Sequence, residues 1–496
     1  MKIVTRRANV AHGGKSNILC LTVDRLNSDC LGAYGATWLD TPGFDALAAD
    51  SILFDSYYAT SLDLTELFRA FWFGEAPYCA RGDERLSLFG ALKAQGFRNY
   101  LVSDVDAVAL NPEIDGDELE ARLLLDPIDA QSPAETLEET AFFKQFAELA
   151  RFISKLDDET RRSHEPWCVW AHLSGWNERW DFPKEMRKRF QEDEEDPEPY
   201  AEITPPYWRR EPTCERHRRA ARRETGEDDA GNAGTPPSER ARLDALDEDD
   251  RRQSVLEAYA AGIVAFDETL AGFLELLKER KILSKTLLLL SGARGCPLGA
   301  PSALGVPRQG ELGSPFYTEE TRAPLVIRLP DATGATLRLP TLCDPRDVYA
   351  TIKEWSNFAP TLKSEEFWRL ERVEVSPFAG VWSGDARAEA DATPNDERST
   401  PTRVEPLTDA PGANLLELLA DETRALRERE LIVAKDADSR ERALVTQEWF
   451  LKRTPITNGA EQSEKLELFK LPDDRFCVND VADRCRQEVE ELTVNL

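Results

Sequence analysis

Charged side chains follow two short apolar runs of this sequence. The run Asn17–Val23 (NILCLTV) leads directly into Asp24 and Arg25, and the run Thr286–Leu290 (TLLLL) is followed by Arg294. A carboxylate can ligate a hard divalent cation, whereas a guanidinium binds anions or pairs with carboxylates. Ligands of open α/β sheets bind at the carboxyl ends of strands, so we expect Asp24 and Arg25 at the mouth of any active site.

The apolar runs also predict the strands that position these residues. A nearly unbroken apolar run bounded by turn signals is typical of a central parallel strand that is buried on both faces. Strands that alternate with helices predict an α/β fold, in which a mostly parallel sheet is flanked by helices on both faces. We predict strands at 17–24, 51–58, 100–103, 167–173, 286–290 and 324–329, and helices at 44–49, within 60–74, and at 86–95, 134–156 and 254–278.

The length of 496 residues predicts one large α/β domain and a smaller one. We assign 1–383 to the large domain, with a Pro-, Arg- and acid-rich insert at about 187–250 that has no apolar period. A second polar stretch, 384–411, indicates a linker. The rest, 412–496, is expected to form a small α+β domain with strands at 443–452 and 465–471 and a last helix.

The net charge of −30 limits the partners that we expect. It argues against nucleic acid and anionic membranes, and it would repel polysulfated polymers unless one local patch were basic. No stretch reaches the roughly 18 apolar residues of a membrane span. The N-terminus lacks the apolar core of a signal peptide. The nine cysteines are scattered, with Cys20 and Cys168 in predicted buried strands, so we expect free thiols and a cytoplasmic location.

Segments at both ends of the chain carry a family resemblance. Asn17–Asp24, Asp29–Gly35 (DCLGAYG) and Thr41–Asp50 (TPGFDALAAD) resemble the opening of a sulfatase, a family of the alkaline-phosphatase superfamily. Tyr317–Ile327 (YTEETRAPLVI) is similar to the family's Tyr-Glu-x-x-x-Arg-x-Pro-Leu-x-Ile run, and Leu466–Asp474 to its late Glu-Leu-Tyr-Asp-Leu segment. The resemblance implies a sulfatase-like fold over most of the chain and, as the family's activity, hydrolysis of sulfuric esters.

The resemblance also implies a cation site and a nucleophile. The family places an Asp-Asp pair of metal ligands after the first strand, and this pair is Asp24-Arg25 here. Its nucleophile lies in a Cys/Ser-x-Pro-x-Arg motif, whose first residue is oxidised to formylglycine. The matching stretch runs from Thr65 to Arg69 (TELFR), so Arg69 fits while Thr65 stands in the nucleophile position. Formylglycine is not made from threonine, and Thr65 could instead cap the N-terminus of a helix.

The remaining family positions are substituted as well. The Lys and His of a Gly-Lys-x-His pattern fall on Asp104 and Asp106, which form either a solvated loop or a relocated carboxylate metal site with Asp24. The lysine that the family carries before Tyr317 is missing. His172, one step inside a strand, is interpreted as a core histidine. The family's Asp-Pro-His and its last ligand pair fall on Gly175, Asn177, Ala293 and Arg294.

Only Asp24 remains of the family's four metal-binding side chains, so we predict no metal cofactor, although the family uses calcium or magnesium. Affinity for a hard dication rises with the number and charge of oxygen ligands. We hypothesise that Arg25 and Arg294 take the place of the cation and pair with Asp24, Asp104 and Asp106.

Three functions follow from these residues. The first is a sulfatase-like protein that has lost hydrolysis and that binds or regulates a protein partner. The second is a sulfuric-ester or phosphoester hydrolase with Thr65 as nucleophile, Arg69 as its orienting cation, and Asp24 with Asp104 or Asp106 for metal. The third is a binder of a small anion through a guanidinium cluster of Arg25, Arg69 and Arg294.

Overall fold

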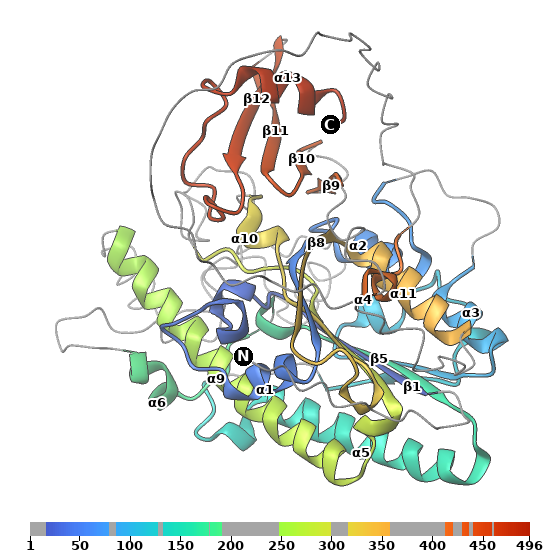
Figure 1. Ribbon diagram of the computed structural model, residues 1–496. Helices are drawn as coiled ribbons and strands as arrows, with labels where there is room; N and C mark the ends of the chain where they lie inside the picture. Colours follow the sequence, from blue (N-terminus) through green and yellow to red (C-terminus); the bar gives the residue numbers. More distant parts are fainter. Residues whose placement is uncertain are drawn as a thin grey trace, which may run out of the picture.

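A large eight-stranded sheet forms the centre of the protein, as seen in the computed structural model (Figure 1). The structure describes residues 16–78, 86–126, 132–177, 179–190, 248–298, 316–357, 412–419, 429–435, 440–458 and 461–496. The strand order is β4-β3-β5-β1-β6-β7-β2-β8, and only β7 runs antiparallel to its neighbours. The strands are β1 (Asn17–Val23), β2 (Ile52–Tyr57), β3 (Arg98–Ser103), β4 (Ala121–Leu124), β5 (Trp167–Leu173), β6 (Thr286–Gly292), β7 (Leu325–Arg328) and β8 (Leu337–Cys343).

The predicted mostly parallel sheet and its central first strand are confirmed. Strand β1 lies between β5 and β6, and all of its residues are buried. Successive side chains of a strand point to opposite faces. Leu19 and Leu21 therefore join the core on one face of the sheet, while Ile18 and Cys20 join the core on the other.

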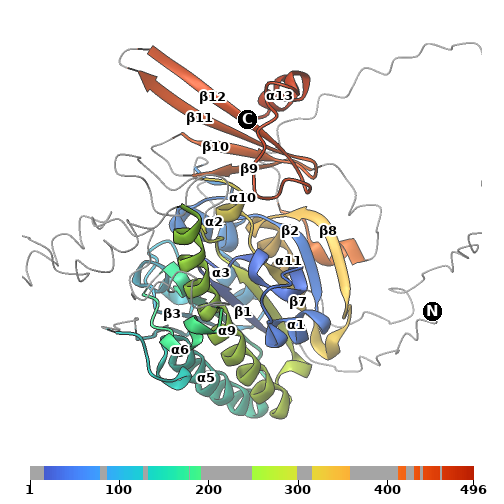
Figure 2. The same ribbon diagram turned by 90° about the vertical axis from the view of Figure 1, so that its left-hand side faces the viewer.

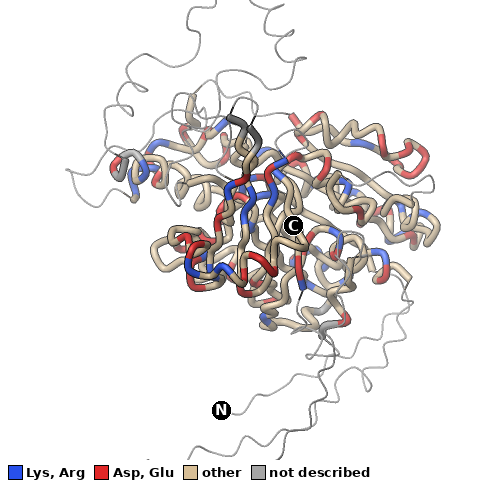
Figure 3. Tube along the Cα trace, turned by 90° about the horizontal axis from the view of Figure 1, so that it is seen from above, with Lys and Arg blue, Asp and Glu red and all other residues tan. Residues whose placement is uncertain are grey.

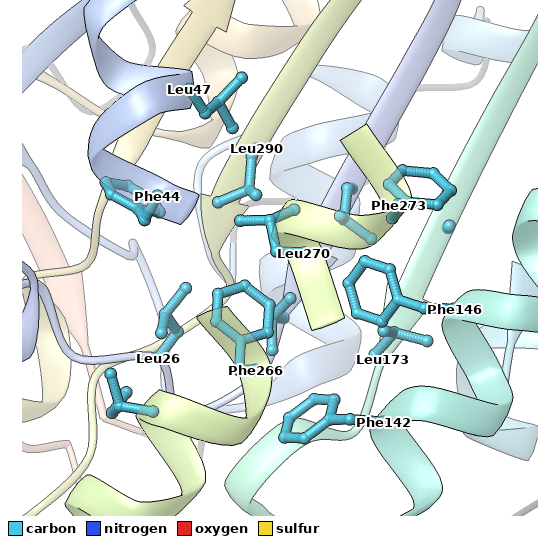
Figure 4. Packing of buried hydrophobic residues seen from close by; sticks show 14 of the residues in the cluster. Leu26, Phe44, Leu47, Phe142, Phe146, Leu173, Phe266, Leu270, Phe273 and Leu290 are labelled. Atoms are coloured by element: carbon cyan, nitrogen blue, oxygen red, sulfur yellow. The ribbon is translucent and has the colours of Figure 1, made fainter. Parts of the chain in front are cut away.

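Helices cover both faces of this sheet. The core that contains Leu19 is closed by α1, α5, α6 and α9, whose aromatic residues Phe44, Phe142 and Phe266 pack together beneath the sheet (Figure 4). The core that contains Ile18 is closed by α2, α3, α4 and α11. The helices are α1 (Pro42–Ala49), α2 (Leu64–Phe73), α3 (Leu88–Ala94), α4 (Asp106–Ala109), α5 (Ala141–Ser163), α6 (Lys184–Arg187), α9 (Glu248–Glu279), α10 (Thr318–Thr321) and α11 (Pro345–Asn357).

A four-stranded antiparallel sheet lies beyond one end of the large sheet (Figure 2). It contacts the loop before α2 through a β-bridge between Ser61 and Ala434. Arg429, which lies just before the first strand of this sheet, pairs with Asp347 of α11 at 2.5 Å. Acidic and basic positions are interspersed over this end of the molecule (Figure 3). Its elements are β9 (Leu431–Ala434), β10 (Arg442–Val445), β11 (Trp449–Asn458), β12 (Glu461–Lys470) and α13 (Arg486–Thr493).

The small C-terminal sheet confirms the predicted α+β character, but the single strand predicted at 443–452 is wrong. Two antiparallel strands, β10 and β11, occupy this stretch and the residues after it. The hydroxyl of Thr446 accepts hydrogen bonds from the backbone N–H groups of Glu448 and Trp449, at 3.1 and 2.9 Å, and so stabilises the turn between them.

Parts of the predicted domain organisation fall on residues that the structure does not describe. Residues 191–247 of the predicted insert and the whole predicted linker at 384–411 lie outside the described residues. Among the described cysteines, Cys20 and Cys168 are free and buried, as predicted. Among the described helices, none combines the length and the apolar character that crossing a bilayer requires.

Candidate functional site

The carboxyl ends of β1 and β6 bring Asp24 and Arg294 together. The two strands pair in register, with Val23 opposite Gly292, so the residues that follow them are neighbours. Arg294 Nε donates to Asp24 Oδ1 at 2.9 Å, and Nη2 donates to Oδ2 at 2.5 Å. The same guanidinium bonds to the Leu62 carbonyl oxygen and, from Nη2 at 3.4 Å, to Asn177 Oδ1. It therefore links β1, β6, the loop before α2 and the segment after β5.

This ion pair is buried. The side chain of Asp24 is 1% exposed and that of Arg294 is 8% exposed. Burial acts to raise the pKa of the Asp24 carboxyl, but the charge and hydrogen bonds of Arg294 outweigh it and hold the pKa below its ordinary value. Asp24 is thus a carboxylate at neutral pH, with each oxygen engaged by the guanidinium.

Arg25 pairs with a carboxylate from a different element. Its Nη1 donates to Glu320 Oε1 at 2.9 Å and to the Gly295 carbonyl oxygen at 3.2 Å. Glu320 is buried in α10, and its other oxygen accepts from the backbone N–H of Phe316 at 2.9 Å. Glu320 was not among the predicted site residues, although it lies inside the family-like segment Tyr317–Ile327.

Asp104 is held by neutral groups, and Asp106 is exposed. Asp104 accepts hydrogen bonds from the backbone N–H and hydroxyl of Ser174, at 2.8 and 2.5 Å, and from Gln145 Nε2 at 2.9 Å. Burial raises the pKa of Asp104, against the effect of these hydrogen bonds. Asp106 is the first residue of α4. The hypothesised pairing of Arg25 and Arg294 with Asp104 and Asp106 is therefore wrong, and the Asp24–Arg294 pair is the part that the structure contains.

The motif that falls in the nucleophile position forms the first turns of α2. Asp63 is the N-cap residue, and its Oδ1 accepts from the backbone N–H groups of Thr65 and Glu66 at 2.8 and 3.1 Å. The interpretation of Thr65 as the cap is therefore wrong. The sequence carries a signal for Asp63 as the N-cap, because Glu66 follows it by three residues, which is the spacing of a capping box. Thr65 itself is exposed.

Arg69 points into a group of glutamates. Its Nη1 bonds to both oxygens of Glu66 at 2.8 Å, its Nη2 bonds to Glu75 at 2.8 Å, and its Nε lies 3.7 Å from Glu113. Each of the three arginines of the predicted guanidinium cluster thus has its own carboxylate partners. The cluster of Arg25, Arg69 and Arg294 is not formed as a shared anion site.

Gly175 occupies a position where a side chain would not fit. Its φ is 55°, and a Cβ atom added there would lie 2.2 Å from the carbonyl oxygen of Asp24. The next backbone N–H, of Trp176, donates to this same oxygen at 3.2 Å. Ala293, like Gly175, stands at a position where the resemblance implies a polar side chain. It is buried, and its backbone N–H donates to the carbonyl oxygen of Val23 at 2.9 Å. Both residues therefore serve close backbone packing around Asp24.

His172 is a core residue, in agreement with its interpretation from the sequence. Its Nδ1 lies 3.0 Å from the Thr22 hydroxyl, and its ring meets the Phe68 ring edge-on at 4.8 Å between centroids. Burial lowers the pKa of His172 to about 4, with the Asp24 charge acting in the opposite direction. The imidazole is therefore neutral at pH 7.

The residues present do not fit a calcium or magnesium ion. Such ions need several oxygen ligands, most of them charged. Both oxygens of Asp24 accept from Arg294, and the adjoining guanidinium repels a cation. Within the described ranges, no group of three or more His, Cys, Asp or Glu side chains is arranged to hold a metal ion.

Comparison with known sequences finds a family model that matches more than half of the chain. The family model described as Sulfatase matches residues 16–362. No curated protein sequence matches this one.

Solved structures resemble the chain over nearly its full length. One was solved in complex with its substrate, D-glucosamine-2-N,6-O-disulfate; it has a TM-score of 0.61 and 15% identity and covers 97% of each chain. The phosphonate monoester hydrolase of Agrobacterium radiobacter has a TM-score of 0.57 at 14% identity and covers 97% of this chain and 94% of its own. The yidJ protein of Bacteroides fragilis, assigned to the sulfatases, has a TM-score of 0.57 at 13% identity, with coverages of 99% and 96%. At these identities, the likeness shows the fold alone.

Proposed function

This chain belongs to the sulfatase family, and we propose that it is a member that has lost sulfuric-ester hydrolysis and acts by binding or regulating a protein partner. The observation that carries this proposal is the bidentate contact of Arg294 with Asp24. A buried guanidinium neutralises the carboxylate that would otherwise attract a metal ion.

The other side chains that hydrolysis would need support the same proposal. An activated nucleophile needs an adjacent base, a cation or a lowered pKa. Thr65 is exposed in the first turn of α2, where its backbone N–H is used by Asp63. Arg69, which would orient the substrate, has its guanidinium engaged by Glu66 and Glu75.

Binding a small anion is less favoured than binding a protein. A sulfate would have to compete with Glu320 for Arg25, with Asp24 for Arg294, and with the glutamates around Arg69. The folded α/β domain remains intact around these pairs, so it can serve as a rigid scaffold for a partner.

The test is a hydrolysis assay with aryl sulfate, aryl phosphate monoester and aryl phosphonate monoester substrates, each with added Ca²⁺, Mg²⁺, Mn²⁺ or Zn²⁺. The wild type is compared with Asp24→Ala and Thr65→Ala. We expect the wild type to release no more product than Asp24→Ala under any condition. Metal-dependent turnover by the wild type that disappears in Thr65→Ala would establish the hydrolase instead.

A further inference from the structure

A groove of about 770 Å³ lies between α5 and α9, away from Asp24 and Arg294. These helices pack side by side (Figure 1), and their last turns lead into β5 and β6. The lining residues run from Ala147 in the first half of α5 to Arg162 in its last turn, together with Leu276 near the end of α9 and Arg280 just after it. The groove therefore extends from the middle of α5 to the edge of the sheet where β5 and β6 begin. Asp24 and Arg294 follow the carboxyl ends of β1 and β6, at the opposite edge.

The floor of the groove is apolar, and one wall is basic. Ala147 and Ala150 leave space between the helices, and Leu276 of α9 is 36% exposed there. Arg151, Lys155 and Arg162 are exposed and line the groove along α5. Because helix positions four, seven and eleven apart share a face, these cations form a row about 16 Å long that also contains Asp158.

The acids that line the groove are already paired. Asp158 accepts from Arg280 at 2.9 Å, and Glu159 lies 3.1 Å from Arg98. Within the part of the chain that the structure describes, no carboxylate forms an ion pair with Arg151, Lys155 or Arg162. Although the chain has a net charge of −30, it presents here three cations without an ion pair to any described carboxylate, beside an exposed leucine.

We propose that this groove docks an acidic amphipathic helix of a partner protein. Acidic side chains spaced along one side of such a helix would meet Arg151, Lys155 and Arg162, and its apolar side chains would cover Leu276. A uniformly charged polymer such as a sulfated polysaccharide or nucleic acid fits less well. It offers nothing apolar to Leu276, and the net charge of the whole chain repels it.

The inference does not rest on the loss of hydrolysis, because the groove and the Asp24–Arg294 pair lie at opposite edges of the sheet. It is tested with a phage-displayed peptide library, randomised over charged and apolar residues and long enough for about four helical turns. Full-length protein is the bait. The affinities of selected peptides are then measured by fluorescence anisotropy at low and high salt.

The decisive comparison uses two double variants with the same change in net charge. Arg151→Glu/Lys155→Glu reverses the charge of two residues in the row, whereas Arg252→Glu/Arg486→Glu reverses the charge of two exposed residues outside the groove. We expect selected peptides to be acidic with apolar residues every three or four positions. Their affinity for the first variant should be roughly tenfold lower than for the wild type, and their affinity for the second variant should equal that for the wild type.

Three results would overturn the proposal. One is a selection that yields no peptides distinguishing the two variants. Another is a set of selected peptides without acidic bias. The third is a heparin oligosaccharide, used as a separate probe, that binds through Arg151 and Lys155 while no acidic peptide does. Circular dichroism of both variants checks that they remain folded.

Discussion

Arg294 donates hydrogen bonds to both carboxylate oxygens of Asp24, although the two residues are 270 positions apart in the sequence. The register of β1 and β6 makes them neighbours. The contact neutralises Asp24, the one carboxylate that the resemblance to sulfatases implies as a metal ligand. It also joins the segments after β5 and before α2, through Asn177 and Leu62.

Removing Arg294 should destabilise the fold strongly. Arg294→Ala would leave the Asp24 carboxylate buried and unpaired, and breaking a buried pair in this way costs about 3 to 5 kcal/mol. Urea unfolding followed by circular dichroism measures this loss. Arg280→Ala, which removes the partly exposed pair with Asp158, is the control and should cost about 1 kcal/mol or less. Similar losses in both variants would contradict the importance of the buried pair.

Gly175→Ala should also destabilise the protein. The added Cβ would meet the Asp24 carbonyl oxygen at 2.2 Å, and the residue has a φ of 55°. Strain of this kind costs on the order of 2 kcal/mol. Gly116→Ala is the matched control, because nothing lies within 4 Å of the added Cβ and no positive φ is needed. If thermal unfolding shows the same melting temperature for both variants, the close packing around Asp24 is not as described.

Stability should fall as the pH falls from 6.5 to about 4, in part because of His172. Its pKa is about 4 in the folded protein against an ordinary 6.5, so the unfolded chain binds the proton first and is favoured. This difference in pKa lowers the free energy of unfolding by about 3 kcal/mol once the pH has fallen below both values. The free energy of unfolding is measured across this pH range for the wild type and for His172→Gln. The variant should show a shallower pH dependence, whereas identical slopes would contradict a neutral buried imidazole.

Asp63 and Thr65 should differ in their effects on stability. Asp63→Ala removes the N-cap of α2 and should cost about 1 kcal/mol. Thr65→Ala changes an exposed residue within the first turn and should change the free energy of unfolding by less than about 0.5 kcal/mol. Chemical unfolding of the two variants checks this. A larger loss of unfolding free energy for Thr65→Ala would show that the Thr65 side chain makes a stabilising contact, which would contradict its exposed position.

The sequence predicted six of the eight strands of the large sheet, because these six contain apolar runs, but it did not predict β4 and β8 at the two edges. The central strand β1 matches its predicted range to within one residue, and β5 matches in full. The resemblance of the N-terminal segments to a sulfatase led to the same fold as the family match over residues 16–362. The hairpin of β10 and β11 was missed although the polar residues Thr446 to Glu448 separate its two apolar runs, Ala443–Val445 and Trp449–Leu451.

The candidate site was only partly predictable. Asp24 and Arg294 follow neighbouring strands, so strand order alone brings them together. The partners of Arg25 and Asp104 depend on how side chains leave the strand ends and on where α10 and α5 pack. Sequence spacing carries no information about the contact with Glu320 or with Gln145.

The most direct test of the central claim is a thermal-shift titration with Ca²⁺, Mg²⁺, Mn²⁺ and Zn²⁺ after chelator treatment. A metal-dependent sulfatase treated in parallel is the positive control. A ligand that binds only the folded state adds about 2.7 kcal/mol at 100 times its Kd, which is a clear shift. We predict no saturable shift for the wild type, because Arg294 occupies both oxygens of Asp24. A saturable shift that is lost in Asp24→Ala would contradict this account.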